Sequence, residues 1–418
     1  MRNNLGLLLA GDQAQTARGE RWKELAELLP DVSARIMENA QTESLTALGF
    51  EKLAPVLSPP GTSSKAFPAV IPAFNYFDAR ASLSESLFNF RNLERERAAS
   101  QSLKAAELNF KDAREVVVLA VGNGYLQSIA AAARVETAEA QVKTAQALYD
   151  KTADQQRAGL APAIDALRSQ VELQTRQQQL IVARNNLAKS NLSLARIIGL
   201  PPGQPFVLTE KVPYQPLTPQ PLETYLLRAY AGRSDYQAAV AQLESAELSR
   251  KGAAAGHYPT FDVAANYGDV GITPAHSNGT WQVFGGVNIP IFAGNRVHSD
   301  VLEADAQLKQ ARSQLSDLRG RIDYEVRTAV LDLNAAAEQV EVARSSVDLA
   351  EQTLAQSRDR FTAGVADNLE VVQAQESVAA AHENYIESLY AHNLAKVELA
   401  YAIGDAEQGV RRYLKGNQ

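Results

Sequence analysis

The residue types that catalyse reactions or bind metals are sparse in this sequence and lack the spacing that such sites need. The chain has no cysteine, which excludes disulfides, thiol catalysis and cysteine-bound zinc. The histidines show neither metal-ligand spacing nor a pattern of acidic partners; they are His257, His276, His298, His382 and His392. The segment VGNG at 121–124 lacks the third glycine of a dinucleotide-binding loop and lies within a helical pattern. We therefore expect no catalytic residue, no cofactor site and no metal site.

Charge and hydropathy exclude two further classes of protein. The net charge is -7, and both signs are mixed along the 418 residues, whereas nucleic-acid binding needs clustered Lys and Arg. The longest wholly apolar run, at 116–121, is far shorter than the roughly 18 residues expected of a membrane-spanning helix. The run GLLLA at 6–10 is shorter than the roughly 7-residue minimum for a signal-peptide core. We expect no nucleic-acid partner, no transmembrane helix and no signal peptide in this chain.

Small and acidic residues gather instead in two segments that resemble each other. RAGLAPAIDALRSQ occupies 157–170, and RFTAGVADNLEVVQAQ occupies 360–375. Gly159 and Gly364 are 205 positions apart, and Gly199 and Gly404 are separated by the same offset. A shared offset at independent landmarks indicates an internal duplication. Each glycine is also a simple helix stop, and that alternative stays open.

Two long helical patterns position these turns. Columns of apolar and small residues recur every seven positions over 103–145 and 301–350, which predicts left-handed supercoiling with closely approaching helices. The patterns predict helices over 90–158 and 296–358, each about 100 Å long. Shorter helical patterns, roughly half as long, are expected end to end in pairs beside the long ones. They cover about 1–29, 163–198, 221–256 and 370–403.

Four segments alternate with the period of β-strands. They lie at 32–37, 78–86, 261–268 and 281–291, with 51–74 and 268–279 expected as hairpin loops. A soluble sheet covered on one side is one interpretation, but the heptad helices lack the pattern to cover it. The other is a membrane barrel, and because open edges are not tolerated in lipid, several chains must close it. Three chains would supply twelve strands.

The expected organisation follows the duplication. Its first repeat covers 1–200, with a β-hairpin at 30–88, and its second covers 221–404, with a β-hairpin at 259–292. Prolines between them predict a linker over 201–220, and 405–418 is expected to be a tail.

With these parts in place, the sequence resembles the outer-membrane efflux (TolC-like) family. The resemblance rests on NIPIFAGNR before the second long helix, on the second turn segment and on its duplicate. The family implies an α+β membrane protein with a duplicated strand-pair and long-helix repeat. It implies a homotrimer whose twelve-stranded β-barrel crosses the lipid of the outer membrane and continues as a coiled-coil α-helical barrel through the periplasm. It also implies a periplasmic adaptor and an inner-membrane transporter as partners.

The resemblance places both turns at the periplasmic mouth of the tube. The residues expected to contact the adaptor are Ala158, Gly159, Leu160, Ala363, Gly364 and Val365. The candidates for a constriction are Asp165, Phe361, Asp367, Glu370 and Gln373. We hypothesise that Glu370 helps to attract cations, although a helix-start acid favoured by the helix dipole is an equal alternative.

The gating contacts of the family are not all present. Some members close the mouth with a tyrosine three residues before the second glycine and a basic residue two after it. Phe361 and Ala366 occupy those positions here, and neither can form that hydrogen bond. Gating would involve other residues, among which Arg358, Arg360 and Asp367 are candidates.

The function that we predict is a passive, non-enzymatic exit duct driven by a partner pump. Two alternatives stay open: an intracellular coiled-coil scaffold, and a diffusion porin that works without a pump. The sequence does not identify the cargo.

Overall fold

The structure is a computed structural model that describes residues 4–49, 69–201, 203–208, 214–218 and 220–415. The chain divides into two compact units. The helical unit comprises Met1–Thr16, Lys104–Gln242 and Ala311–Gln418, and the sheet unit comprises Ala17–Leu103 and Leu243–Gln310. The proposed division into two sequence repeats is a different partition and stays a prediction.

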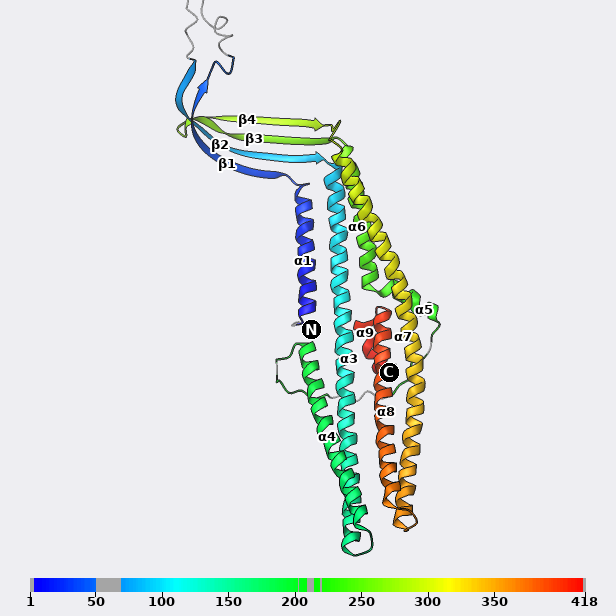
Figure 1. Cartoon of the computed structure of the whole chain (residues 1–418). Coiled ribbons are helices and arrows are strands. Elements are labelled where there is room, and N and C mark those ends of the chain that lie inside the picture. Colours follow the sequence, from blue (N-terminus) through cyan, green and yellow to red (C-terminus); the bar gives the residue numbers. More distant parts are fainter. Residues whose placement is uncertain (1–3, 50–68, 202, 209–213, 219, 416–418) are drawn as a thin grey trace, which may run out of the picture. The chain divides into compact units, whose positions relative to one another are not determined.

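The elements alternate between strand pairs and helices (Figure 1). The helices are α1 (Leu5–Ala26), α3 (Phe90–Arg157), α4 (Ala163–Ile198), α5 (Leu222–Gly232), α6 (Ser234–Ala254), η1 (Ala255–His257), α7 (Arg296–Thr362), α8 (Asn368–Ala402) and α9 (Ala406–Lys415). The strands are β1 (Asp31–Ser44), β2 (Val70–Phe88), β3 (Thr260–Thr273) and β4 (His276–Asn288).

Most helix predictions are confirmed, and one is wrong. The predicted helix over 221–256 is broken, because Arg233 leaves the helical conformation (φ -66°, ψ 122°) and ends α5. The predicted tail after Gly404 contains the helix α9, for which no helix was predicted, and α9 packs Val410 and Tyr413 in the main hydrophobic cluster. Both differences arise from contacts that are distant in sequence, which helical periodicity does not report.

The heptad columns form the buried seams of the long helices. In α7, Ile322 is fully buried, and Ala329 and Ala336 are each 6% exposed. In α3, Ala138 is 7% exposed and Ala145 is 1% exposed. The predicted columns are therefore buried, and small residues at such positions let neighbouring helix axes approach closely. The left-handed supercoil stays a prediction.

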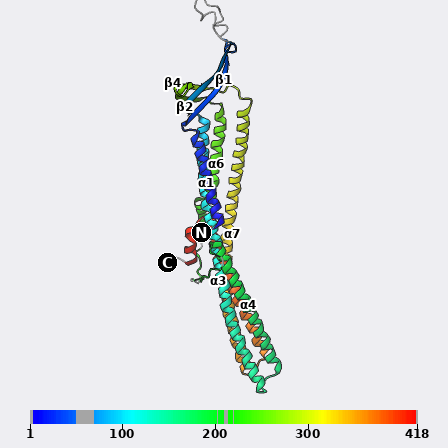
Figure 2. The same cartoon turned by 90° about the vertical axis from the view of Figure 1, so that its left-hand side faces the viewer.

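Within the helical unit, the ends of short helices meet as expected. The Asn4 side-chain amide donates to the carbonyl of Ile197 at 3.3 Å, so α1 begins where α4 ends. The end of α8 meets the α5–α6 break, where Arg233 donates to the carbonyl of Ala402. The view turned by 90° shows α3 and α4 as one hairpin (Figure 2).

The four strands form one antiparallel sheet in the order β1-β2-β3-β4. The loop predictions need correction: 70–74 belongs to β2, and only 274–275 separates β3 from β4. The rest of the first predicted loop lies almost wholly at 50–68, outside the described residues. Strand β4 ends at Asn288, before Pro290, which has no N–H to donate to a ladder. All four strands are longer than the segments of hydrophobic alternation, because polar residues also form ladder hydrogen bonds.

One stretch of α3 bears on the expectation that the chain has no transmembrane helix. An 18-residue stretch of α3 is apolar enough to cross a membrane by length and composition, and 44% of it is buried within the chain. The expectation was based on unbroken apolar runs, whereas the alanines of this stretch keep its average hydropathy high without forming such a run. Core helices of soluble proteins pass the same test, so this stretch does not place α3 in a membrane.

Candidate functional site: the tip turns and the two-faced sheet

The α3–α4 turn (158–162) and the α7–α8 turn (363–367), here called the first and second tip turns, close their helices in the same way. Gly159 has a φ of 74° and Gly364 has a φ of 72°. The N–H of Leu160 donates to the carbonyl of Gln155 at 2.8 Å. The matching bond in the second turn joins the N–H of Val365 to the carbonyl of Arg360 at 3.0 Å. This is the Schellman closure, which needs a left-handed residue and therefore favours glycine.

The apolar residue after each tip glycine points into solvent. Leu160 is 80% exposed, and Val365 is 68% exposed. Side chains at this position of a Schellman motif usually pack back on their own helix. Ala158 and Ala363 are also exposed, so both turns present small and apolar groups without a partner in the described chain.

A hydrophobic cluster within the helical unit lies next to the tip turns. Leu148 of α3 joins Leu354 of α7 and Val371 of α8 in a hydrophobic cluster, with Phe361 packed against it. The amide of Asn368 donates to the backbone carbonyl of Asp165 at 3.1 Å, which ties the start of α8 to the start of α4. The two turns are therefore coupled to each other.

Three of the predicted constriction residues have structural partners. Asp367 is the N-cap of α8, and its carboxylate accepts from the N–H of Glu370 at 3.2 Å. The Glu370 carboxylate lies 3.2 Å from the Arg360 guanidinium. Asp165 lies near Arg168, at 3.8 Å, and its side chain is only 15% exposed. Of the other candidates, Phe361 is half-buried and Gln373 is exposed.

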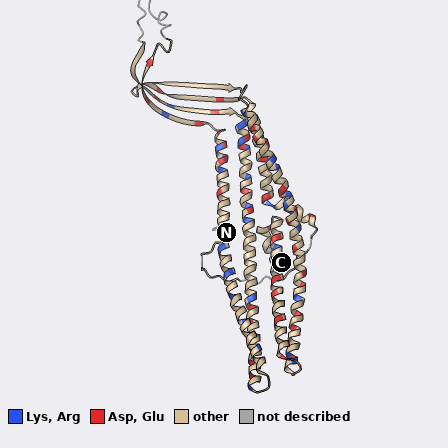
Figure 3. Ribbon diagram, in the orientation of Figure 1, with Lys and Arg blue, Asp and Glu red and all other residues tan. Residues whose placement is uncertain are grey.

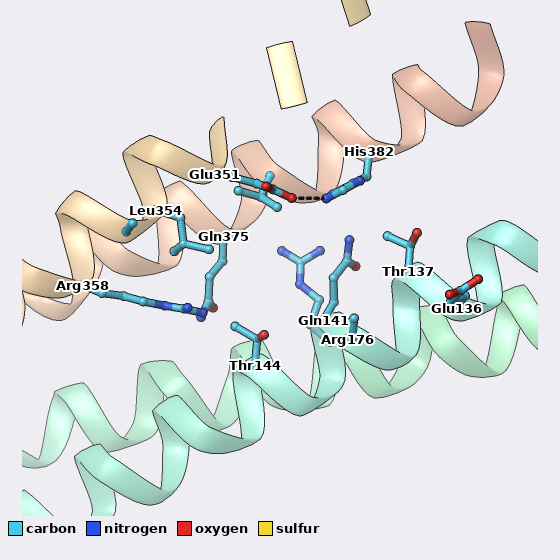
Figure 4. A pocket seen from close by; sticks show the side chains of 13 residues that line it. Glu136, Thr137, Gln141, Thr144, Arg176, Glu351, Leu354, Arg358, Gln375 and His382 are labelled. Atoms are coloured by element: carbon cyan, nitrogen blue, oxygen red, sulfur yellow. Dashed lines mark hydrogen bonds and ion pairs between the residues drawn. The ribbon is translucent and has the colours of Figure 1, made fainter. Parts of the chain in front are cut away.

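A cleft of about 550 Å³ lies between the two helical hairpins (Figure 4). Within it, His382 is 3.1 Å from Glu351, and the buried Arg176 pairs with Glu172 at 2.6 Å. Gln375 is 7% exposed, and neither of its amide atoms has a hydrogen-bond partner among the described residues. Arg358, a gating candidate, also lines this cleft.

The described part of the linker is held by two buried side chains of α8. Both Lys396 and His392 contact the backbone carbonyl of Gln215. Burial lowers the pKa of Lys396 to about 8, and burial and the charge of Lys396 lower the pKa of His392. No sequence pattern singled out this attachment, because a lone Lys and His at helical spacing are usually solvated.

The sheet register separates an apolar face from a polar face. Two cross-strand rows of the apolar face are Val32, Leu83, Ala265 and Val283, followed by Ala34, Ala81, Tyr267 and Trp281. Two rows of the polar face are Ser33, Ser82, Asn266 and Gln282, followed by Arg35, Arg80, Gly268 and Thr280. Trp281 is 75% exposed and Val283 is 65% exposed, so the apolar face has no cover in the described chain. Among the residues that the structure describes, the outer strands β1 and β4 each have one edge without a partner strand.

Nothing in the described residues points to metal chemistry or to a nucleic-acid surface. No group of three or more His, Asp and Glu side chains in residues 4–49, 69–201, 203–208, 214–218 and 220–415 could hold a metal ion. Acidic and basic residues are both spread along the helices (Figure 3).

The chain belongs to the outer membrane efflux protein family, whose sequence pattern it matches over residues 11–200 and 226–405. This is a family of outer-membrane transport channels related to TolC. The chain is 22% identical to "Outer membrane protein TolC" of Escherichia coli (strain K12), over 79% of this chain and 70% of that protein. It is 24% identical to "Pyoverdine export outer membrane protein OpmQ" of Pseudomonas putida, over 79% of this chain and 71% of that protein.

Solved structures have the same fold. The crystal structure of the outer membrane protein VceC from Vibrio cholerae superposes with a TM-score of 0.77 at 20% identity, covering 96% of this chain and 93% of that chain. The match to the family's sequence pattern confirms the family prediction that was made from NIPIFAGNR and the two turn segments.

Proposed function

We propose that this chain is the outer-membrane exit duct of a multi-component export system whose energy comes from an inner-membrane pump. The observation that carries the proposal is the sheet, which exposes one apolar face, presents one polar face and leaves both edges unpaired. Such a sheet suits a barrel wall with lipid on one side and water on the other. Family membership supplies the outer-membrane setting.

Three copies would close the wall. The free edge of β4 in one copy would pair with the free edge of β1 in the next, because backbone N–H and C=O groups without partners are not tolerated in lipid. The coiled-coil helices would continue the wall as a tube, and small residues in their seams support such close packing. The protein would act by conducting cargo, with no bond made or broken.

Adjacent cysteines on β4 test the two faces. The chain has no cysteine of its own, so an introduced thiol is the only one. In proteoliposomes, we expect a membrane-impermeant maleimide to label Gln282→Cys, because Gln282 lies on the polar face, and to leave Val283→Cys at least tenfold slower, because lipid covers it. Both variants should label alike after denaturation, which controls for intrinsic reactivity.

Equal labelling of the two thiols in the membrane would contradict the barrel. The same preparation should give a detergent-corrected mass of three chains and discrete conductance steps in planar bilayers. A monomer without conductance would leave the coiled-coil scaffold as the better explanation. Conductance without any adaptor binding would favour the diffusion porin.

The tip turns are the surface that we propose for the periplasmic adaptor. The exposed side chains of Leu160 and Val365 are each expected to bury apolar area there, at about 25 cal/mol per Å². Leu160→Asp and Val365→Asp should each weaken binding of the purified host adaptor about tenfold or more, measured by biolayer interferometry. Val207→Asp, at a site 86% exposed in the linker, should change nothing. Unchanged binding by both tip variants would remove the turns from the interface.

The acidic constriction also stays a proposal, and two of its candidate residues already have partners within the chain. Asp367 is engaged as a helix cap and Glu370 is paired with Arg360, so Glu370 could face the pore only as part of that ion pair.

A further inference from the structure

The polar face of the sheet carries a pair of arginines that no packing requirement explains. Arg35 of β1 and Arg80 of β2 are direct cross-strand partners in the register. Like charges directly opposite each other on an antiparallel pair are destabilising. This pair places two positive charges on one face of the sheet, at one level.

Only one of these two charges is compensated nearby. The Asp78 carboxylate accepts from the Arg80 guanidinium at 2.6 Å, and the Asp78 side chain is 10% exposed. Arg35 is exposed and has no ion-pair or hydrogen-bond partner among the described residues. Asp31 shares its face but lies four residues away along β1, roughly 13 Å at 3.3 Å per residue.

The rest of the row adds no charge that could compensate the guanidinium groups. Gly268 and Thr280 complete the row that contains both arginines. A Cβ at Gly268 would lie 2.3 Å from the backbone oxygen of Ala79 and 2.4 Å from the Cβ of Arg80, so any side chain there would collide with the strand that carries Arg80. The preceding row contains Ser33 and Ser82, whose short side chains do not screen the charges.

We propose that these arginines form a cationic belt inside the duct that favours anionic cargo, such as organic carboxylates, over cations. The inference rests on the proposed function, because it requires the polar face to line the lumen. Three chains would place two arginines and one aspartate from each copy around the same level, leaving a net positive ring. Fixed charges around a narrow polar passage raise the local concentration of the opposite charge.

A thiol reporter beside the belt measures its potential directly. Ser82→Cys lies one row from both arginines on the same face, roughly 7 Å away. We would compare its modification rates by the anionic sulfonatoethyl and the cationic trimethylammonioethyl methanethiosulfonates in proteoliposomes. Relative to free cysteine, the anionic reagent should be favoured by about tenfold. Arg35→Gln with Arg80→Gln should abolish that preference.

The control removes a charge from the opposite face of the same strand. Glu85 lies in the apolar-face row with Val263 and Gly285, so Glu85→Gln should leave the rate ratio unchanged. As a second readout, citrate should reduce the single-channel current of the reporter protein and have little effect on that of the double arginine variant. The thiol reporter and the citrate block together distinguish the effect of the arginine belt from the effect of charges at the tip turns.

The outcomes separate this inference from the proposed function. If both reagents reach Ser82→Cys with a charge-independent ratio, and citrate does not block, the duct stands and the cationic belt is wrong. If neither reagent reaches the thiol in the membrane while Val283→Cys reacts, the sheet faces are reversed and the proposed duct itself fails.

Discussion

Gly404→Ala should destabilise the helical unit far more than Gly364→Ala, although both glycines have a φ of 72°. At Gly364 a Cβ would meet nothing within 4 Å, whereas at Gly404 it would lie 2.5 Å from the backbone nitrogen of Arg233 and the carbonyl carbon of Gly232. Both variants carry the left-handed penalty of about 1–2 kcal/mol. Gly404→Ala adds overpacking against backbone, about 1–3 kcal/mol more. Urea unfolding followed by far-UV circular dichroism would measure both losses.

Comparing the two variants separates the cost of the left-handed backbone from the cost of the steric clash. Equal losses in the two would show that the backbones at the α8–α9 and α5–α6 junctions are not in contact. A larger loss of stability in Gly404→Ala than in Gly364→Ala would confirm that the two backbones approach closely. The same approach is seen from the other side, because a Cβ at Gly232 would lie 2.8 Å from the carbonyl oxygen of Ile403.

Arg233→Met should cost about 3–5 kcal/mol, the range for breaking a buried ion pair from one side. The Arg233 side chain is 5% exposed and pairs with Asp235 at 2.7 Å and with Glu325 at 2.5 Å. Burial works against its charge, but hydrogen bonds to Asp235 and Glu325 outweigh burial and hold the pKa of Arg233 above its usual value. Its guanidinium also lies over the ring of Tyr401, 5.6 Å from the centroid. Methionine keeps much of the volume and leaves both carboxylates unpaired.

An exposed arginine provides the control for Arg233→Met. Arg327 pairs with Asp323 one helical turn away at 2.7 Å, and both side chains are about half exposed. Because ion pairs on the surface contribute little to folding stability, Arg327→Gln should leave the midpoint of urea unfolding unchanged. Similar midpoints for Arg233→Met and Arg327→Gln would mean that Arg233 does not hold the α5–α6 break in place.

The break at Arg233 illustrates what the sequence could not predict. Helical periodicity runs through 221–256, since the residues that flank the break have ordinary helical patterns. The chain bends because the Arg233 guanidinium donates hydrogen bonds to carboxylates on α6 and α7 and to a backbone carbonyl at the end of α8. The helix α9 is a second example, because a ten-residue helix containing Gly409 is stable only where its apolar side chains can pack on the main cluster.

The candidate site was predictable in part for the same reason. The left-handed turns at Gly159 and Gly364 follow from local sequence, as does the cap formed by Asp367. The pairing of Glu370 with Arg360 was not predicted, because it depends on how two helices meet at a turn. Likewise, alternation indicated that each strand has two faces, but only the register placed Arg35 opposite Arg80.

The sequence by itself determined the long helices, their buried seams, the turns that end them and the family, because each depends on a local period or a conformation that only some residues adopt. The tertiary structure decided where α5 ends, that α9 forms and which side chains share a row of the sheet. Those outcomes depend on free energies of contact between segments far apart in the chain, and on a strand register in which a shift of one residue would exchange the two faces.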